Sequence, residues 1–269
     1  MNRFVSASFI LALAAPALVA QEQQGRDFRW EGAVASGKWV KLQNINGDVE
    51  VVPASGNRVE ITAIKRNRRG DTDDVRIEVK RYGTNEENVF VCAIWGEATC
   101  DENGYNSPRR RNRDRDRDDD EDNTEVQFTV RLPRGVNIET GTVNGSVDIR
   151  GATGEVNASS VNGGVDAESD GGPVSASTVN GSIRASMRSL GRGDLEFSTV
   201  NGSITVELPE ALDADLRMST VNGTLSSRDF PLTVSGRFNP QNMRATIGKG
   251  GTRLSFSTVN GNVEIRKRV

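Results

Sequence analysis

The chain has no histidine among its 269 residues. Histidine is the most frequent general acid or base near neutral pH and a frequent metal ligand, so its absence excludes Ser–His and Cys–His nucleophile pairs and histidine-based metal sites. No S-x-x-K motif occurs, and carboxylates such as Asp148, Asp166 and Glu207 occupy outward positions of alternating segments, where solvation explains them. A glycosidase-like carboxylate pair stays formally open. We therefore predict no catalytic residue, no cofactor and no metal ligand.

Aromatic residues are also scarce, at 5% of the chain, whereas glycine is abundant at 28 residues. This composition excludes a thick, aromatic-rich core and favours a thin, turn-rich β fold. The formal net charge is only −3, which does not indicate a nucleic-acid partner.

Long apolar runs are absent except at the start of the chain. Residues 1–20 have the features of a secretory signal peptide, with Arg3 before an apolar stretch and small residues before a cut after Ala20. The apolar stretch is too short to span a membrane comfortably. We expect an exported protein without a transmembrane segment, located in the periplasm or at the cell surface, whose mature chain 21–269 forms a single β-repeat domain.

The chain has two cysteines, Cys92 and Cys100. In an oxidising compartment such a pair is first interpreted as a disulfide. Because the loop between them is short, the bridge would stabilise the fold by about 2–3 kcal/mol.

The most informative feature of the sequence is a repeated Asn-Gly turn. It occurs in NINGDVEV (44–51), TVNGSVDI (142–149), SVNGGVDA (160–167), TVNGSIRA (178–185), TVNGSITV (199–206), TVNGTLSS (220–227) and TVNGNVEI (258–265). From Asn144 the steps between asparagines are 18, 18, 21, 21 and 38 residues. A fixed period near 20 residues indicates a repeat architecture. The last step is about twice the others, so we expect residues 229–250 to be a degenerate unit.

Each repeat has the same internal pattern. In the clearest copy, Leu195, Phe197 and Thr199 alternate before the turn, and Ile204 and Val206 alternate after it. Alternation of this kind is strand periodicity. Each unit is therefore a strand, an Asn-Gly corner, a second strand and a variable loop. The predicted corner residues are Asn46, Gly47, Asn144, Gly145, Asn162, Gly163, Asn180, Gly181, Asn201, Gly202, Asn222, Gly223, Asn260 and Gly261.

Two all-β architectures fit this pattern. In a β-solenoid of repeats of about 18–21 residues, each unit is one coil, and stacked asparagines exchange amide hydrogen bonds. Glycine would supply a positive φ at each bend. In the alternative, an antiparallel β-meander, each Asn-Gly makes a two-residue hairpin that sets Phe197 opposite Val206. Similarity over whole units favours the solenoid.

The string of T-V-N-G-[SDN]-[VI] units after an export signal resembles the bacterial DUF4097 family of adhesin-like β-strand-repeat proteins. The resemblance runs from about Val40 to Val269, and residues 132–149 look like the family's usual entry into the repeats. It implies a solenoid-like fold and an envelope or extracellular location. It carries over no catalytic residue.

The front half contains features outside the repeat pattern. Segments between residues 28 and 100 alternate like strands, so we expect them to belong to the same fold. Trp30, Trp39 and Trp95 all lie in this half. They are interpreted as a cap over the open end of the solenoid, with glycan binding as the alternative.

A charged insert at 108–123 interrupts the alternation. It contains the run PRRRNRDRDRDDDED and nothing apolar, so we predict a disordered, solvated loop. A sharper interpretation makes its arginines a contact arm for an anionic partner, namely Arg109, Arg110, Arg111 and Arg113.

These observations predict a non-catalytic, exported scaffold of the cell envelope or surface that is adhesin-like and binds an envelope polysaccharide or protein. One alternative is a periplasmic sensor or regulatory binding module that uses the charged arm. The other is a polysaccharide-active enzyme.

Overall fold

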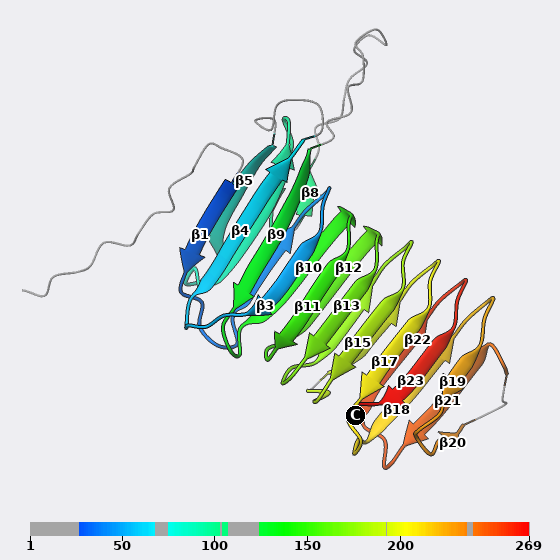
Figure 1. Cartoon of the computed structure of the whole chain (residues 1–269). Coiled ribbons are helices and arrows are strands. Elements are labelled where there is room, and N and C mark those ends of the chain that lie inside the picture. Colours follow the sequence, from blue (N-terminus) through cyan, green and yellow to red (C-terminus); the bar gives the residue numbers. More distant parts are fainter. Residues whose placement is uncertain are drawn as a thin grey trace, which may run out of the picture.

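A computed structural model of the chain describes residues 27–67, 75–102, 104–106, 124–191, 193–235 and 239–268. These residues form strands and no helix. Two long sheets face each other and give an elongated stack (Figure 1). The predicted signal peptide, residues 1–20, and the predicted insert, residues 108–123, lie outside the described residues.

The first sheet, sheet A, contains ten strands among the described residues. In spatial order they are β1 (Asp27–Gly32), β4 (Val59–Arg66), β9 (Glu125–Leu132), β3 (Val49–Pro53), β11 (Val147–Ala152), β13 (Val165–Ser169), β15 (Ile183–Met187), β17 (Ile204–Leu208), β23 (Val263–Lys267) and β19 (Leu225–Ser227).

The second sheet, sheet B, contains eleven strands among the residues that the structure describes. A separate hairpin is formed by β7 (Thr99–Asp101) and β8 (Gly104–Asn106). The order in sheet B is β20 (Thr233–Val234), β21 (Asn242–Ile247), β18 (Ala214–Ser219), β22 (Thr252–Ser257), β16 (Leu195–Ser198), β14 (Val174–Ser177), β12 (Val156–Asn162), β10 (Asn137–Asn144), β2 (Trp39–Gln43), β6 (Asn88–Trp95) and β5 (Val75–Tyr82).

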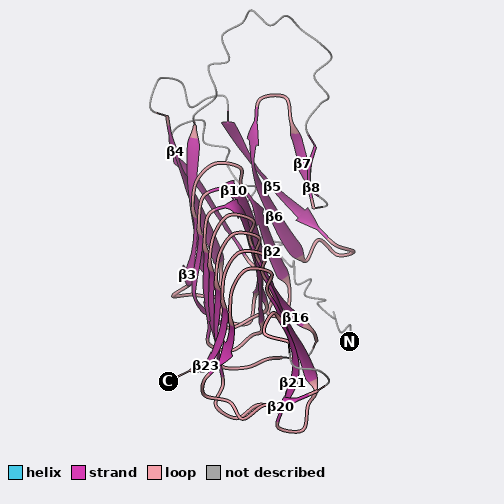
Figure 2. Cartoon of the chain, turned by 90° about the vertical axis from the view of Figure 1, so that its right-hand side faces the viewer, coloured by secondary structure: helices cyan, strands magenta, loops and turns pink. Residues whose placement is uncertain are grey.

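The two strands of each repeat lie in different sheets. β16 lies in sheet B and β17 in sheet A, and the corner at Asn201 joins them. Equivalent strands of neighbouring repeats pair in parallel, with Ile183 opposite Ile204 in sheet A. Figure 2 looks along the stack and shows the loops as nested arcs. The predicted β-solenoid is confirmed, and the hairpin alternative is wrong because the strands that flank an Asn-Gly do not pair with each other.

Strand alternation explains why the core lies between the sheets. Inward residues are buried in both sheets, and outward residues are not. In the middle coils small residues such as Ala158 and Ala176 face inward. Further along, Phe197 and Phe256 stack with ring centroids 5.2 Å apart and planes 8° apart.

The coils do not stack in chain order at the C-terminal end. β22 and β23, the last repeat, lie between β16/β17 and β18/β19, so the corner at Asn260 separates those at Asn201 and Asn222. In Figure 1 the red β23 lies between β17 and β19. The expected degenerate coil at 229–250 is wrong. That segment instead supplies β21, which pairs antiparallel with β18, and β20, which pairs antiparallel with β21. The chain then returns as β22, which pairs with β18 on the side away from β21.

Antiparallel strands cover both sheets at the front of the parallel stack and sheet B at its rear. At the front, β4 pairs antiparallel with β9 and with β1, and β5 pairs antiparallel with β6. At the rear, β21 pairs antiparallel with β18 and β20. The front half therefore belongs to the same fold, and Trp30 on β1 is buried at its end of sheet A, whereas Trp39 and Trp95 are half-buried. Irregular terminal strands are one way in which proteins protect a sheet edge.

A second, small core lies on the outer side of β6. Cys92 of β6 and Cys100 of β7 form a disulfide that holds the β7–β8 hairpin against this strand. Phe90, Ile94 and Ala98 are buried with them. β6 is consequently buried on both faces, which accounts for its continuous apolar run.

The Phe197–Phe256 stack ties the inserted coil to its neighbour. We expect Phe256→Ala to lower the free energy of unfolding by about 3–5 kcal/mol, because it leaves a cavity in the core. Chemical denaturation followed by circular dichroism would measure this change. Val259→Ala, on the exposed side of the same coil, is the matched control and should cost no more than about 0.5 kcal/mol. Equal losses in the two variants would contradict this description of the core.

Candidate functional site

The Asn-Gly corners line one edge of the stack in the order Asn46, Asn144, Asn162, Asn180, Asn201, Asn260 and Asn222. From Asn144 to Asn222 the side-chain amides form a ladder, in which the Nδ2 of each asparagine after Asn144 donates to the Oδ1 of the preceding asparagine in the stack. The distances are 2.9 Å for Asn162 to Asn144, 2.9 Å for Asn180 to Asn162, 2.8 Å for Asn201 to Asn180, 2.7 Å for Asn260 to Asn201 and 2.8 Å for Asn222 to Asn260. Asn46 instead donates to the Thr124 carbonyl at 3.1 Å.

The corner glycines are required by close approach between coils. A Cβ at Gly163 would lie 1.9 Å from the carbonyl oxygen of Gly145, and one at Gly181 would lie 2.0 Å from that of Gly163. Among the seven corner glycines only Gly47, with φ 121°, and Gly145, with φ 157°, adopt a φ that disfavours side chains. The expectation of a positive φ at every bend is therefore wrong. Glycine is needed because the backbone of the next coil occupies the space of a side chain.

In the six repeats from Asn144 onward, the residue two positions before the asparagine carries an inward hydroxyl that bonds the neighbouring coil. Each hydroxyl is buried and donates to the carbonyl of a corner glycine. The pairs are Thr142 to Gly47 at 2.9 Å, Ser160 to Gly145 at 2.7 Å, Thr178 to Gly163 at 2.8 Å, Thr199 to Gly181 at 2.9 Å, Thr258 to Gly202 at 2.9 Å and Thr220 to Gly261 at 2.9 Å. A buried carbonyl without a partner would be costly, so this row stabilises the corner.

The valine between the hydroxyl residue and the asparagine points outward in every repeat that has it. These side chains are 37–59% exposed, and they are Val143, Val161, Val179, Val200, Val221 and Val259. Together with the asparagine ladder they form what we call the corner edge. A continuous exposed apolar row is unusual on a protein surface and is typical of interaction sites.

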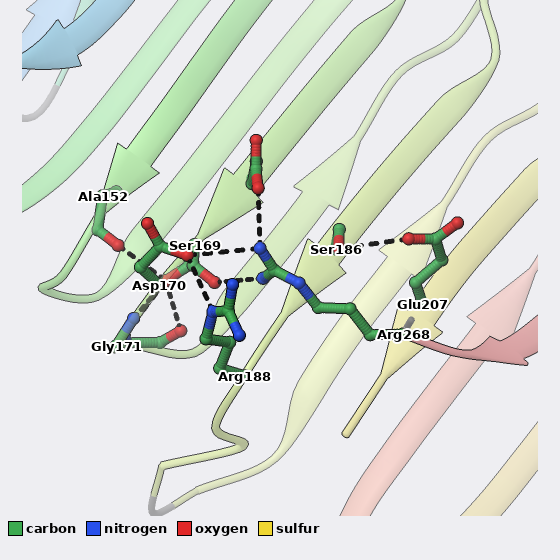
Figure 3. Close-up of polar contacts among 10 residues, drawn as sticks. Ala152, Ser169, Asp170, Gly171, Ser186, Arg188, Glu207 and Arg268 are labelled. Atoms are coloured by element: carbon green, nitrogen blue, oxygen red, sulfur yellow. Dashed lines mark hydrogen bonds and ion pairs between the residues drawn. The ribbon is translucent and has the colours of Figure 1, made fainter. Parts of the chain in front are cut away.

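The outer face of sheet A carries a network of ion pairs centred on Arg268 (Figure 3). The Arg268 guanidinium donates to the Ser169 carbonyl at 2.8 Å and to carboxylate oxygens of Glu168 at 2.6 Å and Asp170 at 3.2 Å. Arg188 donates to the same oxygen of Asp170 at 3.0 Å. The Arg268 side chain is only 10% exposed. This network fastens the last coil to β13.

The pKa values of two aspartates on this face are shifted in opposite directions. The hydrogen bond from Arg188 is the largest influence on Asp170 and holds its pKa below the ordinary value. Burial opposes this shift, and the charges of Arg188 and Arg268 add to the lowering. Burial raises the pKa of Asp166, and the neighbouring Asp148 carboxylate adds to the effect. Asp166 lines a shallow, open depression together with Arg184, Ser186, Thr205, Glu207 and Arg266.

The outer face of sheet B is polar and rich in hydroxyl groups. Ser159, Ser177 and Ser198 occupy equivalent positions on adjacent strands, and Ser257 and Ser219 continue the row. An open depression on this face is lined by polar side chains, which are Glu139, Asn157, Ser159, Ser175, Ser177, Glu196 and Ser198. Small-molecule sites are usually concave and mostly apolar, so an open polar depression suits an extended partner better.

The remaining predicted features are placed only in part. The arginines of the predicted contact arm, Arg109, Arg110, Arg111 and Arg113, lie outside the described residues. Across the described ranges, no group of three or more histidine, cysteine, aspartate or glutamate side chains could hold a metal ion. In the same part of the chain, no helix has the length and apolar character that a membrane span requires.

Sequence reasoning missed two elements of these surfaces. The hydroxyl row had a visible signal, because Thr or Ser precedes the Val-Asn-Gly of every later repeat. Arg268 had no such signal, since it lies in a short basic run, RKRV, which is typical of a solvated terminus.

One family model and one solved structure agree with this fold. The family model described as Toastrack DUF4097 matches residues 27–266. The chain is similar to the crystal structure of a candidate cell adhesion protein from Clostridium sporogenes, with a TM-score of 0.52 and 10% identity over 90% of this chain and 100% of that one. It also matches a candidate adhesin from Bacteroides fragilis, with a TM-score of 0.29 and 11% identity over 91% and 99% of the two chains. A search of curated proteins found no significant match.

The close approach of corner glycines is testable with one methyl group. We expect Gly181→Ala to lower the free energy of unfolding by about 1–3 kcal/mol, because overpacking forces two coils apart. Gly56→Ala is the control, since no heavy atom lies within 4 Å of the added Cβ there. Thermal and urea unfolding would measure both changes, and a Gly181→Ala protein as stable as the control would refute the steric explanation.

The Asp170 ion pairs predict a pH dependence of stability. A carboxylate whose folded pKa lies below its ordinary value of 3.8 stabilises the fold above that value, and its contribution disappears as the pH falls through the lowered pKa. Asp170→Asn should therefore be less stable than the parent by a constant amount between pH 7 and 5, and the difference should shrink below pH 3.8. Urea midpoints across this range would show it. A difference that grows with acidification would contradict the assignment.

Proposed function

Because the chain belongs to the Toastrack DUF4097 family, we propose that it is a non-catalytic, adhesin-like scaffold of the cell envelope that binds an extended polymeric partner. The observation that carries the proposal is the repetition of one surface unit. Each coil from Asn144 to Asn222 presents the same exposed valine and the same laddered asparagine at the corner edge.

Repetition of this kind suits multivalent binding. When many weak contacts are held at fixed spacing, each further contact forms at high effective concentration, and the overall affinity exceeds that of any single contact. Adjacent strands in a sheet are about 4.8 Å apart, so the corner edge and both outer faces offer contacts at this spacing. The description of the Clostridium sporogenes relative as a candidate cell adhesion protein supports the same role.

Export is the second part of the proposal. Residues 1–20 would act as a signal peptide, and the mature chain would begin at Gln21. The Cys92–Cys100 disulfide supports this assignment, because such bonds persist mainly in oxidising compartments. We propose that the charged insert at 108–123 is a solvated loop.

Deletion of one coil tests the multivalent scaffold. Removing residues 145–162, which is one 18-residue period, joins Asn144 to Gly163 and keeps an Asn-Gly corner. We expect the shortened mature protein to remain folded, because the backbone of each coil pairs only with adjacent coils and the deletion leaves the Arg268 contacts in place. Its affinity for isolated envelope polysaccharide should fall severalfold, with the parent mature chain as the reference in the same binding assay.

Three outcomes would contradict the proposal. Complete loss of binding with the fold intact would indicate one discrete site in the deleted coil. Unchanged affinity would mean that the repeats are not the contact surface. Failure of the parent chain to bind envelope fractions, cells or polysaccharides would reject the adhesin-like role.

A further inference from the structure

Two arginines face each other on the outer side of sheet B near its C-terminal end. Arg217 of β18 and Arg244 of β21 are directly opposite in the antiparallel pair. Both side chains are exposed on the same face of the sheet. Like charges at directly opposed positions destabilise a sheet, so this pair opposes folding unless an anion lies between the two guanidinium groups.

The two guanidinium groups also lack partners within the part of the chain that the structure describes, where neither makes a hydrogen bond or an ion pair. Other cations on the same face do have partners. Lys41 pairs with Glu139 at 3.1 Å, and Arg253 hydrogen-bonds Asp194 at 2.7 Å. Lys41 and Arg253 are therefore neutralised by carboxylates of the chain, whereas Arg217 and Arg244 have no such partner among the described residues.

The surroundings of the arginine pair supply hydroxyl groups, one amide and one carboxylate. The pair lines a depression whose other members are Glu196, Met218, Ser219, Asn242, Ser255, Phe256 and Ser257. Ser219 and Ser257 lie with their hydroxyl oxygens 3.4 Å apart. Hydroxyl and amide groups beside two guanidinium groups match a ligand that carries both a carboxylate and several hydroxyls, as an acidic sugar does.

The depression continues along the stack. Glu196 lines it and also lines the neighbouring depression that extends to Glu139 on β10. From β10 to β21 the groove crosses seven strands, which is roughly 29 Å at the usual strand spacing. A polymer chain fits this length, whereas a single small anion would use only the end with the arginines.

We infer that this groove binds an acidic polysaccharide, with a uronate carboxylate held between Arg217 and Arg244 and sugar hydroxyls on the serine row. The inference rests on the proposed function and assigns its partner class and its anchoring residues. Arginine suits the anchor because its planar guanidinium binds carboxylates through two parallel hydrogen bonds. Glu196 would accept hydrogen bonds from sugar hydroxyl groups. Its negative charge would weaken the attraction of the groove for a second carboxylate nearby.

The test compares the double variant Arg217→Ala/Arg244→Ala with Arg29→Ala/Arg134→Ala in the full mature chain. Arg29 and Arg134 are exposed residues at the other end of the stack, so the control removes the same charge. Titration calorimetry with oligogalacturonate at fixed salt should show at least tenfold weaker binding for the first variant, equivalent to about 1.4 kcal/mol. The control should change less than twofold, and Glu196→Gln should bind more tightly.

A stability measurement separates the site from general damage. Removing the opposed arginines should leave the melting temperature unchanged or raise it, because the like-charge contact disappears. Oligogalacturonate should raise the melting temperature of the parent protein and not that of Arg217→Ala/Arg244→Ala, since only a bound ligand stabilises the folded state.

Several outcomes would overturn the inference. One is an equal loss of affinity for oligogalacturonate in both double variants. Another is equally tight binding of oligogalacturonate whose carboxyl groups have been reduced. The third is equally tight, arginine-dependent binding of polyglutamate, which would indicate an acidic protein partner. A parent chain that binds envelope polysaccharide independently of Arg217 and Arg244 would reject this site and leave the proposed function standing. A parent chain that binds no polysaccharide would reject both.

Discussion

The structure depends on one contact, the close approach of successive coils at the Asn-Gly corner. The carbonyl oxygen of one corner glycine lies where the next glycine would carry its Cβ, as at Gly163 and Gly181. At that separation the neighbouring hydroxyl, from Thr178 for example, reaches the same carbonyl, and the asparagine amides reach one another. Three of the four residues of Thr-Val-Asn-Gly are therefore fixed by contact with the adjacent coil, which explains why the motif recurs almost unchanged.

The fourth residue, valine, is not fixed by this contact. Its side chain points outward and is largely exposed in each coil. The geometry that holds the corner together thus also sets these side chains at a constant spacing, and the same holds for the outward rows of both sheets. A stack built in this way repeats its surface as strictly as its interior, which is the property that a multivalent scaffold needs.

The two ends of the stack depart from this regularity, and the departures have structural and functional consequences. Strands of the front half and of the segment 229–250 run antiparallel and close the stack. The last repeat is inserted between two earlier ones, and Arg268 then fastens it to β13. Arg217 and Arg244, which have no partner among the described residues, lie where the regular stack meets its antiparallel cap, so two uncompensated cations mark the place where the repeat pattern ends.

The sequence by itself determined an all-β repeat fold and favoured the solenoid over a meander of hairpins, because the alternation within each unit and the fixed period between units are local properties of the chain. It also showed which positions face inward and where the corners lie. Only the tertiary structure decided the order of the coils, since a repeat identical to its neighbours pairs equally well with several of them. It likewise showed why glycine is required at the corners, which residues Arg268 contacts and that Arg217 lies opposite Arg244, because each of these depends on strands distant in the chain.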